Sequence, residues 1–263
     1  MHLFFRQFPK KMPVPKVLVV LDFDHTIVDD NSDTRVWNLL PGKNVPQDIK
    51  NSYKDHKSWT AYMAAIFLHL HTLGVQKKDI INCFRDIPFT QGMLEFLKYQ
   101  QRVPSVDTII ASDANSFFIS CIMEGVGLAN AYKEIFTNPA EFDDEGCLKI
   151  QHHHQHDCPR CAVNMCKGTI LKDYIARMRQ SNGMEYDRVL FVGDGGNDFC
   201  PCLALGERDF VFPRKGYKLI QKIEKYNKES PSDSEPHQKL RATVVPWDNA
   251  HEILNCLQGI VEG

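Results

Sequence analysis

The chain has 263 residues, a formal net charge of −2 and a pI near 6.6. A balance this close to neutral argues against nucleic acid or a membrane surface as a partner, and no apolar run approaches the roughly 20 residues that span a bilayer. With 43% hydrophobic residues the chain can bury a sizeable core, so we expect one domain with an insertion. Nine cysteines, an odd number, suit a reducing compartment better than a disulfide framework and predict a cytoplasmic protein.

The first strong element is an apolar, valine-rich run that ends in two carboxylates. Residues 1–15 before it are basic and broken by proline, and we expect them to form a poorly ordered arm. Lys16–Leu21 is typical of a strand buried on both faces of a parallel sheet. Asp22 and Asp24 follow at the carboxyl end, where such sheets bind ligands. Two nearby carboxylates repel unless they share a cation or a proton, so this strand end predicts a Mg²⁺ site, unless it is only an acidic turn.

Residues 34–90 carry helical signals. Trp37–Leu40 and Trp59–Leu73 space their apolar residues by three and four, as amphipathic helices do. We therefore expect a helical insertion at 34–90 that divides a core made of residues 16–33 and 91–263.

The rest of the chain alternates strands and helices. The expected helices are Met93–Gln100, Ser116–Gly127, Thr169–Arg179, Phe199–Leu205 and Ala250–Val261. The expected strands are Thr108–Ser112, Arg188–Val192, Asp209–Phe212 and Ala242–Val245. We expect an irregular connection at Asn130–Asp157 and a polar surface loop at 227–240. This alternation is typical of an α/β fold with a doubly wound, Rossmann-like parallel sheet.

Two later strand ends also carry polar side chains. Ser112 ends one strand, and its hydroxyl could donate a hydrogen bond to a phosphoryl oxygen. Gly-Asp-Gly-Gly-Asn-Asp at 193–198 follows another, where glycines permit a positive φ and a close approach of the backbone to a phosphate. Asp194 and Asp198 add carboxylates for a hard cation. Strand ends reading Asp-x-Asp-x-Thr, Ser and Gly-Asp-Gly-x-Asn-Asp, in this order, resemble those of the haloacid dehalogenase superfamily of phosphatases.

The resemblance implies a fold and a mechanism. It implies the core sheet of that superfamily with a small helical cap inserted after the first strand, which would exclude water and select the substrate. Asp22 would be the nucleophile that forms an aspartyl-phosphate. Asp24 would be the general acid and base, protonating the leaving alcohol and then activating water.

The resemblance also implies a metal and a lysine. One Mg²⁺ per chain would be held by carboxylates, one of them contributing its backbone carbonyl and another ligating directly or through water: Asp22, Asp24, Asp194 and Asp198. A lysine would neutralise the phosphate and the nucleophile; Lys167 is our choice and Lys172 the alternative. Ser112 would complete the catalytic set.

The stretch from His152 to Cys166 is unusually rich in histidine and cysteine. Imidazole and thiolate bind Zn²⁺, and the Cys-x-x-Cys of Cys158 and Cys161 has the spacing of half a site. The alternative is a loop of buried, inert cysteines, because a second Cys-x-x-Cys is missing. A zinc site here would allow a different function, a zinc-dependent binding or regulatory module on an inactive phosphatase core.

Three longer motifs resemble one subfamily. They are His-x-His-x-Cys-x-x-Cys-x-x-x-x-Cys-Lys, Gly-Asp-Gly-Gly-Asn-Asp-Phe-Cys-Pro and Pro-Arg-Lys-Gly-Tyr, which resemble phosphatases of phosphoethanolamine and phosphocholine and their paralogues for pyridoxal 5′-phosphate. The resemblance implies a small phosphomonoester as the substrate, phosphoethanolamine or phosphocholine first and pyridoxal 5′-phosphate as the alternative. A cationic head needs anionic or aromatic partners. Asp33 and Asp113 are our candidates for the charge, although they could also be a helix cap and a turn. The aromatic candidates, which could instead fill the core of the insertion, are Trp37, Tyr53, Trp59 and Tyr62.

Overall fold

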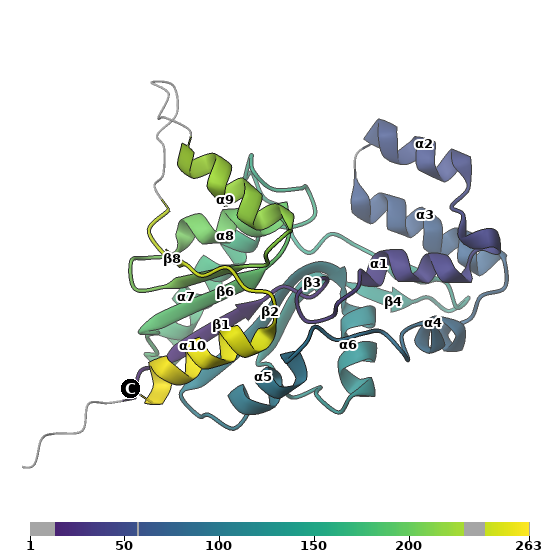
Figure 1. The fold of residues 1–263 in the computed structure, drawn as a ribbon. Helices are drawn as coiled ribbons and strands as arrows, with labels where there is room; N and C mark the ends of the chain where they lie inside the picture. The colour runs from purple at the N-terminus through teal and green to yellow at the C-terminus, as the bar shows by residue number, and fades with distance from the viewer. Residues whose placement is uncertain (1–13, 57, 229–239, 263) are drawn as a thin grey trace, which may run out of the picture.

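The computed structural model describes residues 14–56, 58–228 and 240–262. Its centre is a six-stranded sheet in the order β3-β2-β1-β6-β7-β8 (Figure 1), in which every neighbouring pair is parallel. The strands are β1 (Val17–Leu21), β2 (Val106–Asn115), β3 (Glu134–Asn138), β6 (Arg188–Gly193), β7 (Phe210–Pro213) and β8 (Thr243–Val244). The order reverses direction at β1, as in a doubly wound sheet. The predicted fold class is confirmed.

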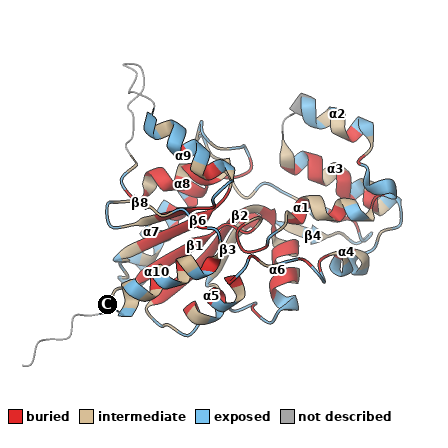
Figure 2. Ribbon diagram, in the orientation of Figure 1, coloured by how far each residue is buried: buried red, intermediate tan, exposed pale blue. Residues whose placement is uncertain are grey.

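Helices cover both faces of this sheet (Figure 2). They are α5 (Met93–Gln100), α6 (Ser116–Gly125) and α10 (Ala250–Glu262) on one face, and α7 (Lys167–Asn182), α8 (Phe199–Ala204) and α9 (Lys218–Lys228) on the other. Successive residues of β1 point to opposite faces, so Val19 and Leu21 pack toward the first group while Leu18 and Val20 pack toward the second. Burial on both sides explains the unbroken apolar run.

A helical lobe stands beside the sheet (Figure 1). It contains α1 (Ser32–Arg35), α2 (Gln47–His56), α3 (Trp59–Thr72) and α4 (Lys77–Cys83), with the short 3₁₀ turns η1 (Val36–Leu39) and η2 (Pro41–Lys43). The chain leaves the core and returns at one place, because Val28 and Phe89 form an isolated antiparallel bridge. The N–H of Thr90 also donates to the carbonyl of Ile27 at 3.0 Å. The lobe is therefore joined to the end of β1 by two adjacent segments.

The expectation of an irregular connection at Asn130–Asp157 was wrong in part. That segment contains β3 and a small antiparallel hairpin, β4 (Ala140–Phe142) and β5 (Leu148–Ile150). The hairpin packs against α3, so it extends the helical lobe from a distant part of the sequence. Strands of three residues are too short to show the alternation by which a strand is recognised.

Other boundaries also differ from the predictions. The helix predicted at Trp37–Leu40 is the 3₁₀ turn η1 (Val36–Leu39), which ends at an extended Leu40 before Pro41 begins η2. Helix α9 was not predicted, although Leu219 and Ile223 are both buried. Residues 1–13 of the predicted arm and 229–239 of the predicted loop lie outside the described residues. Among the helices of the described ranges, none combines the length and apolarity needed to cross a bilayer.

Candidate active site

Three strand ends meet at one edge of the sheet. The parallel register pairs Leu21 of β1 with Ile110 of β2 and Val192 of β6. Asp22 and Asp194, which follow β1 and β6, consequently lie at the same edge. The N–H of Asp22 donates to the carbonyl of Val192 at 3.0 Å and fixes the first of these strand ends.

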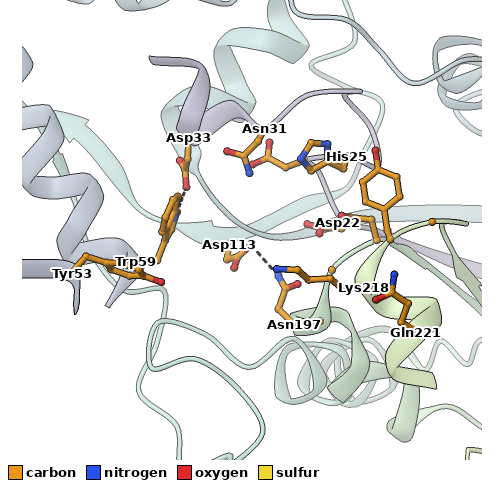
Figure 3. A pocket seen from close by; sticks show the side chains of 16 residues that line it. Asp22, His25, Asn31, Asp33, Tyr53, Trp59, Asp113, Asn197, Lys218 and Gln221 are labelled. Atoms are coloured by element: carbon orange, nitrogen blue, oxygen red, sulfur yellow. Dashed lines mark hydrogen bonds between the residues drawn. The ribbon is translucent and has the colours of Figure 1, made fainter. Parts of the chain in front are cut away.

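A cleft of about 740 Å³ opens at this edge, between the sheet and the helical lobe (Figure 3). Its lining combines acidic, aromatic and amide side chains with the glycine-rich loop: Asp22, Asp24, His25, Asn31, Asp33, Tyr53, Trp59, Asp113, Asp194, Gly195, Gly196, Asn197, Gly216, Tyr217, Lys218 and Gln221. Five carboxylates therefore face a single cavity. Of the other predicted site residues, Ser112, Lys167 and Asp198 lie behind this surface and are buried.

Lys167 connects the acidic motifs that follow β1 and β6. Its ammonium group lies 2.9 Å from Asp22 Oδ1 and 2.7 Å from Asp198 Oδ1, and all three side chains are buried. Burial alone would lower the pKa of Lys167, but the charges of Asp198 and Asp22 raise it overall, so the side chain stays protonated. The alternative Lys172 is exposed on α7, away from the cleft lining. Lys167 is the lysine that the fold brings to the first strand end.

Asp198 organises the glycine-rich loop. Its Oδ2 accepts hydrogen bonds from the N–H groups of Asp194 at 3.1 Å and Gly195 at 2.8 Å, while Oδ1 faces Lys167. A Cβ at Gly193 would lie 2.4 Å from Asp198 Oδ2, so that glycine is required for space. The expected positive φ is absent from this loop, whose glycines at 193, 195 and 196 do not adopt it. Since both oxygens of Asp198 already accept hydrogen bonds, its contacts are those of a residue that shapes the loop.

Asp24 lies on the cleft wall and accepts a hydrogen bond from the N–H of Ser32 at 2.9 Å. Desolvation, and then the charge of Asp33, raises its pKa well above the ordinary value of a carboxyl group. A raised pKa favours the protonated form of the carboxyl group. This is the form that donates a proton to a leaving group.

Three carboxylates fit a divalent cation. Oxygens of Asp22, Asp194 and Asp198 all lie within 4.8 Å of one another. Burial, and then the charge of Asp22, raises the pKa of Asp194 to about 7. A cation placed between Asp22 and Asp194 would relieve this repulsion, and oxygen ligands with an open cleft beside them suit Mg²⁺. The donor set therefore fits the expected metal.

The two candidate substrate-binding carboxylates both reach the cleft (Figure 3), Asp33 from α1 and Asp113 from β2. Asp33 Oδ2 accepts a hydrogen bond from Trp59 Nε1 at 2.7 Å, and burial raises its pKa to about 7. Asp113 Oδ1 accepts one from Asn197 Nδ2 at 3.0 Å. Neither matches the simpler alternative: Asn31 is the N-cap of α1, and Asp113 belongs to β2, which runs three residues beyond the predicted end.

Of the aromatic candidates, Tyr53 and Trp59 line the cleft, with ring centroids 5.8 Å apart. Tyr62 is buried beneath them, 5.3 Å from Trp59. Trp37 is not among the residues of the cleft lining. The insertion thus offers one aromatic pair to a ligand.

The sequence did not single out several residues of the cleft. His25 has a φ of 54°, which reverses the chain directly after Asp24. Arg214 holds this turn, donating to the carbonyl of His25 at 2.6 Å and to Asp29 Oδ1 at 2.7 Å. Lys218 and Gln221 line the cleft from the start of α9. The Pro-Arg-Lys-Gly-Tyr motif was the available signal for Arg214, whereas nothing in the sequence indicated that α9 would face the cleft.

Ser112 and the histidine-rich loop lie apart from the open cavity. The Oγ of Ser112 accepts a hydrogen bond from the N–H of Ala114 at 3.3 Å, so its proton remains available to donate. In the candidate zinc stretch the histidine rings contact backbone groups: His153 the carbonyl of Thr137, and His154 the N–H of Cys166. The cysteines of that stretch, Cys158, Cys161 and Cys166, lie close to one another and to Cys200.

Comparisons with known proteins identify a family and relatives for this chain. The family model described as Putative Phosphatase matches residues 17–261. The chain is 38% identical over 248 residues to the bovine pyridoxal phosphate phosphatase PHOSPHO2, covering 94% of this chain and 99% of the relative. It is 34% identical over 249 residues to the human phosphoethanolamine/phosphocholine phosphatase, covering 94% and 90%.

Solved structures share the fold. A haloacid dehalogenase family hydrolase from Salmonella enterica serovar Typhi matches with a TM-score of 0.60 and 17% identity, covering 97% of this chain and 74% of that one. Phosphoserine phosphatase, solved as an analogue of its phospho-aspartyl intermediate, matches with a TM-score of 0.54 and 18% identity, covering 93% and 99%. At these identities the likeness concerns the fold alone.

Proposed function

The chain belongs to the Putative Phosphatase family and is a phosphatase of the haloacid dehalogenase type, and from this membership we propose that it hydrolyses small phosphomonoesters in a Mg²⁺-dependent reaction through an aspartyl-phosphate. The observation that carries the proposal is the pairing of buried Asp22 with Lys167 at 2.9 Å, beside a second carboxyl group, Asp24, whose pKa is raised. Asp22 is assigned to attack on phosphorus, and Asp24 to proton transfer.

The residues divide the reaction into two steps. In the first, a carboxylate oxygen of Asp22 attacks phosphorus, and the bond from phosphorus to the ester oxygen breaks. Asp24 gives its proton to that oxygen, which leaves as the alcohol. In the second, Asp24 takes a proton from a water molecule that attacks the aspartyl-phosphate, so that inorganic phosphate leaves and Asp22 is restored.

Other residues hold this arrangement in place. Lys167 offsets the charge of Asp22, while Asp198 positions Lys167 and the backbone of the loop at 193–198. Asp22, Asp194 and the backbone carbonyl of Asp24 would hold Mg²⁺, which when bound neutralises charge on the phosphoryl oxygens. The hydroxyl proton of Ser112 is assigned to a phosphoryl oxygen.

The helical insertion at 34–90 is assigned as a cap over the cleft. It supplies Tyr53 and Trp59 to the cavity, and Asp33 lies at its start. An acidic wall beside two aromatic rings suits an ammonium or trimethylammonium head. Phosphoethanolamine or phosphocholine is therefore our first candidate. With no disulfide among its nine cysteines, the chain is also assigned to a reducing compartment, the cytoplasm.

Pyridoxal 5′-phosphate is the second candidate. The bovine relative of that name is 38% identical, against 34% for the human phosphoethanolamine/phosphocholine phosphatase. A pyridine ring could stack on Tyr53 or Trp59, and the exposed Lys218 could meet its phenolate oxygen.

A substrate panel tests both parts of the proposal. Phosphate release is measured from phosphoethanolamine, phosphocholine, pyridoxal 5′-phosphate and an uncharged aryl phosphate, with Mg²⁺ and again after dialysis against a chelator. We expect turnover only with Mg²⁺, and the highest kcat/KM on the two cationic esters. Full activity after chelation would contradict the metal, and a clear preference for pyridoxal 5′-phosphate would select the second candidate.

A further inference from the structure

Four cysteines meet behind the active site, although the sequence separates them. Cys158, Cys161 and Cys166 come from the loop before α7, and Cys200 from the first turn of α8. Their sulfur atoms all lie within 4.8 Å of one another. Cys200 Sγ is 3.7 Å from both Cys158 Sγ and Cys166 Sγ. Cys158 and Cys161 are thus joined by Cys166 and Cys200, which supply the second pair of sulfurs in place of a second Cys-x-x-Cys.

These separations match the edge of a metal–thiolate tetrahedron. A Zn–S bond of about 2.3 Å places neighbouring sulfurs about 3.8 Å apart in tetrahedral geometry. A disulfide would instead bring two sulfurs to about 2.05 Å. The observed 3.7 Å contacts agree with the first arrangement. Four thiolates leave no open position for water, as is typical of structural rather than catalytic zinc.

The surroundings are built for close approach of the sulfurs. A Cβ at Gly168 would lie 2.8 Å from Cys200 Sγ, so a larger residue there would push the two elements apart. The N–H of Thr169 donates to Cys166 Sγ at 3.4 Å, and His156 Nδ1 accepts from the N–H of Cys158 at 3.2 Å. Hydrogen bonds of this kind orient ligands in known metal sites. The loop is therefore shaped around the cysteines.

A thiolate is the form of cysteine that binds metal, so metal binding at this cluster releases the thiol protons.

We infer that Cys158, Cys161, Cys166 and Cys200 bind one structural Zn²⁺ that joins the loop before α7 to the start of α8. Zn²⁺ binding releases the protons of the cysteine thiols to solvent, and the oxidation states of zinc and sulfur do not change. The loop at 152–166 becomes part of the catalytic fold, and the idea of a separate zinc-binding module is unnecessary.

The position of the cluster gives the zinc a role in the site. Lys167 directly follows Cys166, and Asp198 lies two residues before Cys200. Each member of the Lys167–Asp198 ion pair of 2.7 Å is thus close in sequence to a zinc ligand. Fixing the sulfurs of Cys166 and Cys200 fixes the backbone next to both members of this pair. The zinc is a positioning element and touches neither substrate nor the reacting atoms.

Metal content and spectroscopy test the inference on the intact protein. Protein purified under reducing conditions, without added metal, should contain about one zinc per chain. After removal with a zinc-selective chelator in the presence of Mg²⁺, addition of Co²⁺ should produce the ultraviolet charge-transfer and visible d–d bands of tetrahedral cobalt–thiolate coordination. Zinc removal should lower the Tm by roughly 5 °C or more, and Zn²⁺ should restore it. A wild-type chain without zinc and without a cobalt spectrum overturns the inference, as does a disulfide within the cluster.

Matched cysteine variants show which sulfurs bind. Cys161→Ser and Cys200→Ser should each weaken Zn²⁺ binding at least about tenfold and alter the cobalt spectrum. Cys121→Ser and Cys256→Ser, which are also half-buried but lie on α6 and α10, should leave both unchanged. Unchanged binding in the first pair overturns the inference. The cobalt spectrum of the wild-type protein tests the inference even if a cysteine variant does not fold.

Discussion

The molecule holds two kinds of candidate metal-ligand cluster near Lys167. In the first, Asp22 and Asp194 line an open cleft and Asp198 is buried behind them, whereas the second consists of four cysteine sulfurs. Carboxylate oxygens beside an open cleft suit a Mg²⁺ ion that also binds a phosphate. Four thiolates suit a Zn²⁺ ion that has no coordination position left for another ligand. Lys167 and Asp198 connect the two clusters: Lys167 contacts both Asp22 and Asp198 and directly follows Cys166, while Asp198 lies two residues before Cys200.

The two clusters differ in the role that we expect each to have, one in catalysis and the other in stability. In the carboxylate cluster, burial and then the charge of Asp22 raise the pKa of Asp194, and a bound cation would offset this charge. In our proposal, zinc at the cysteine cluster fixes the backbone next to Lys167 and Asp198. Substitutions in the carboxylate cluster should lower the rate of phosphate release, and substitutions in the cysteine cluster should lower the thermal stability and the zinc content.

The largest expected effect comes from Asp22→Asn. The amide is nearly isosteric but a very poor nucleophile, so turnover should fall by roughly 10⁴-fold or more. Steady-state phosphate release measures it, with circular dichroism and zinc content as controls that should match the wild type. Near-normal turnover by a homogeneous preparation would exclude the covalent mechanism.

Asp24→Asn should cost about 10²- to 10⁴-fold, the usual contribution of a general acid or base. The loss should be smaller on an aryl phosphate, because its leaving group needs less protonation. Phosphorylated protein should then accumulate and can be detected by mass spectrometry after an acid quench. Equal losses on alkyl and aryl esters, without any phosphoprotein, would mean that Asp24 acts only on the metal site.

Much of the carboxylate cluster could be predicted because its residues directly follow strands. An apolar run followed by Asp22 and Asp24 fixes both the strand and the edge on which the acids lie. The choice between Lys167 and Lys172 could not come from spacing alone. It depends on where α7 begins, and Cys166 is its N-cap.

The cysteine cluster could be predicted only by half. Cys200 is 34 residues after Cys166, and no local pattern relates the two. The short strands β4 and β5 were missed for a similar reason, because packing on α3 and not their own sequence determines them. Long-range packing decides both features, whereas local periodicity decides the core sheet.

Asp33→Asn sharpens the comparison within the cleft itself. If Asp33 recognises a cationic head, kcat/KM on phosphoethanolamine and phosphocholine should fall about ten- to a hundredfold, since a charge-assisted contact contributes roughly 1.5–3 kcal/mol. The loss on an uncharged aryl phosphate should be much smaller. Trp59→Phe is the matched control, because it removes the hydrogen bond to Asp33 at 2.7 Å but keeps the carboxylate.

Equal losses on both classes of ester would assign Asp33 to support of the loop. No loss on either, together with a wild-type preference for pyridoxal 5′-phosphate, would favour the second candidate substrate.

The smallest expected effect is a pH dependence of stability that Mg²⁺ removes. In the metal-free protein the pKa of Asp194 is raised to about 7, chiefly by burial, from an ordinary value near 4. Between about pH 4 and pH 7 the folded state therefore holds a proton that the unfolded state has lost, so stability falls as pH rises through this window. Mg²⁺ binds the ionised carboxylate and should stabilise the protein more at pH 8 than at pH 5.

A difference of about 1 kcal/mol between the stabilisation by Mg²⁺ at the two pH values corresponds to roughly 2–4 °C in Tm. Thermal unfolding with and without Mg²⁺ at both pH values measures it, with Asp194→Asn as the control that should remove the difference. The same Mg²⁺-induced shift at pH 5 and pH 8 would show that Asp194 does not couple the proton to the metal.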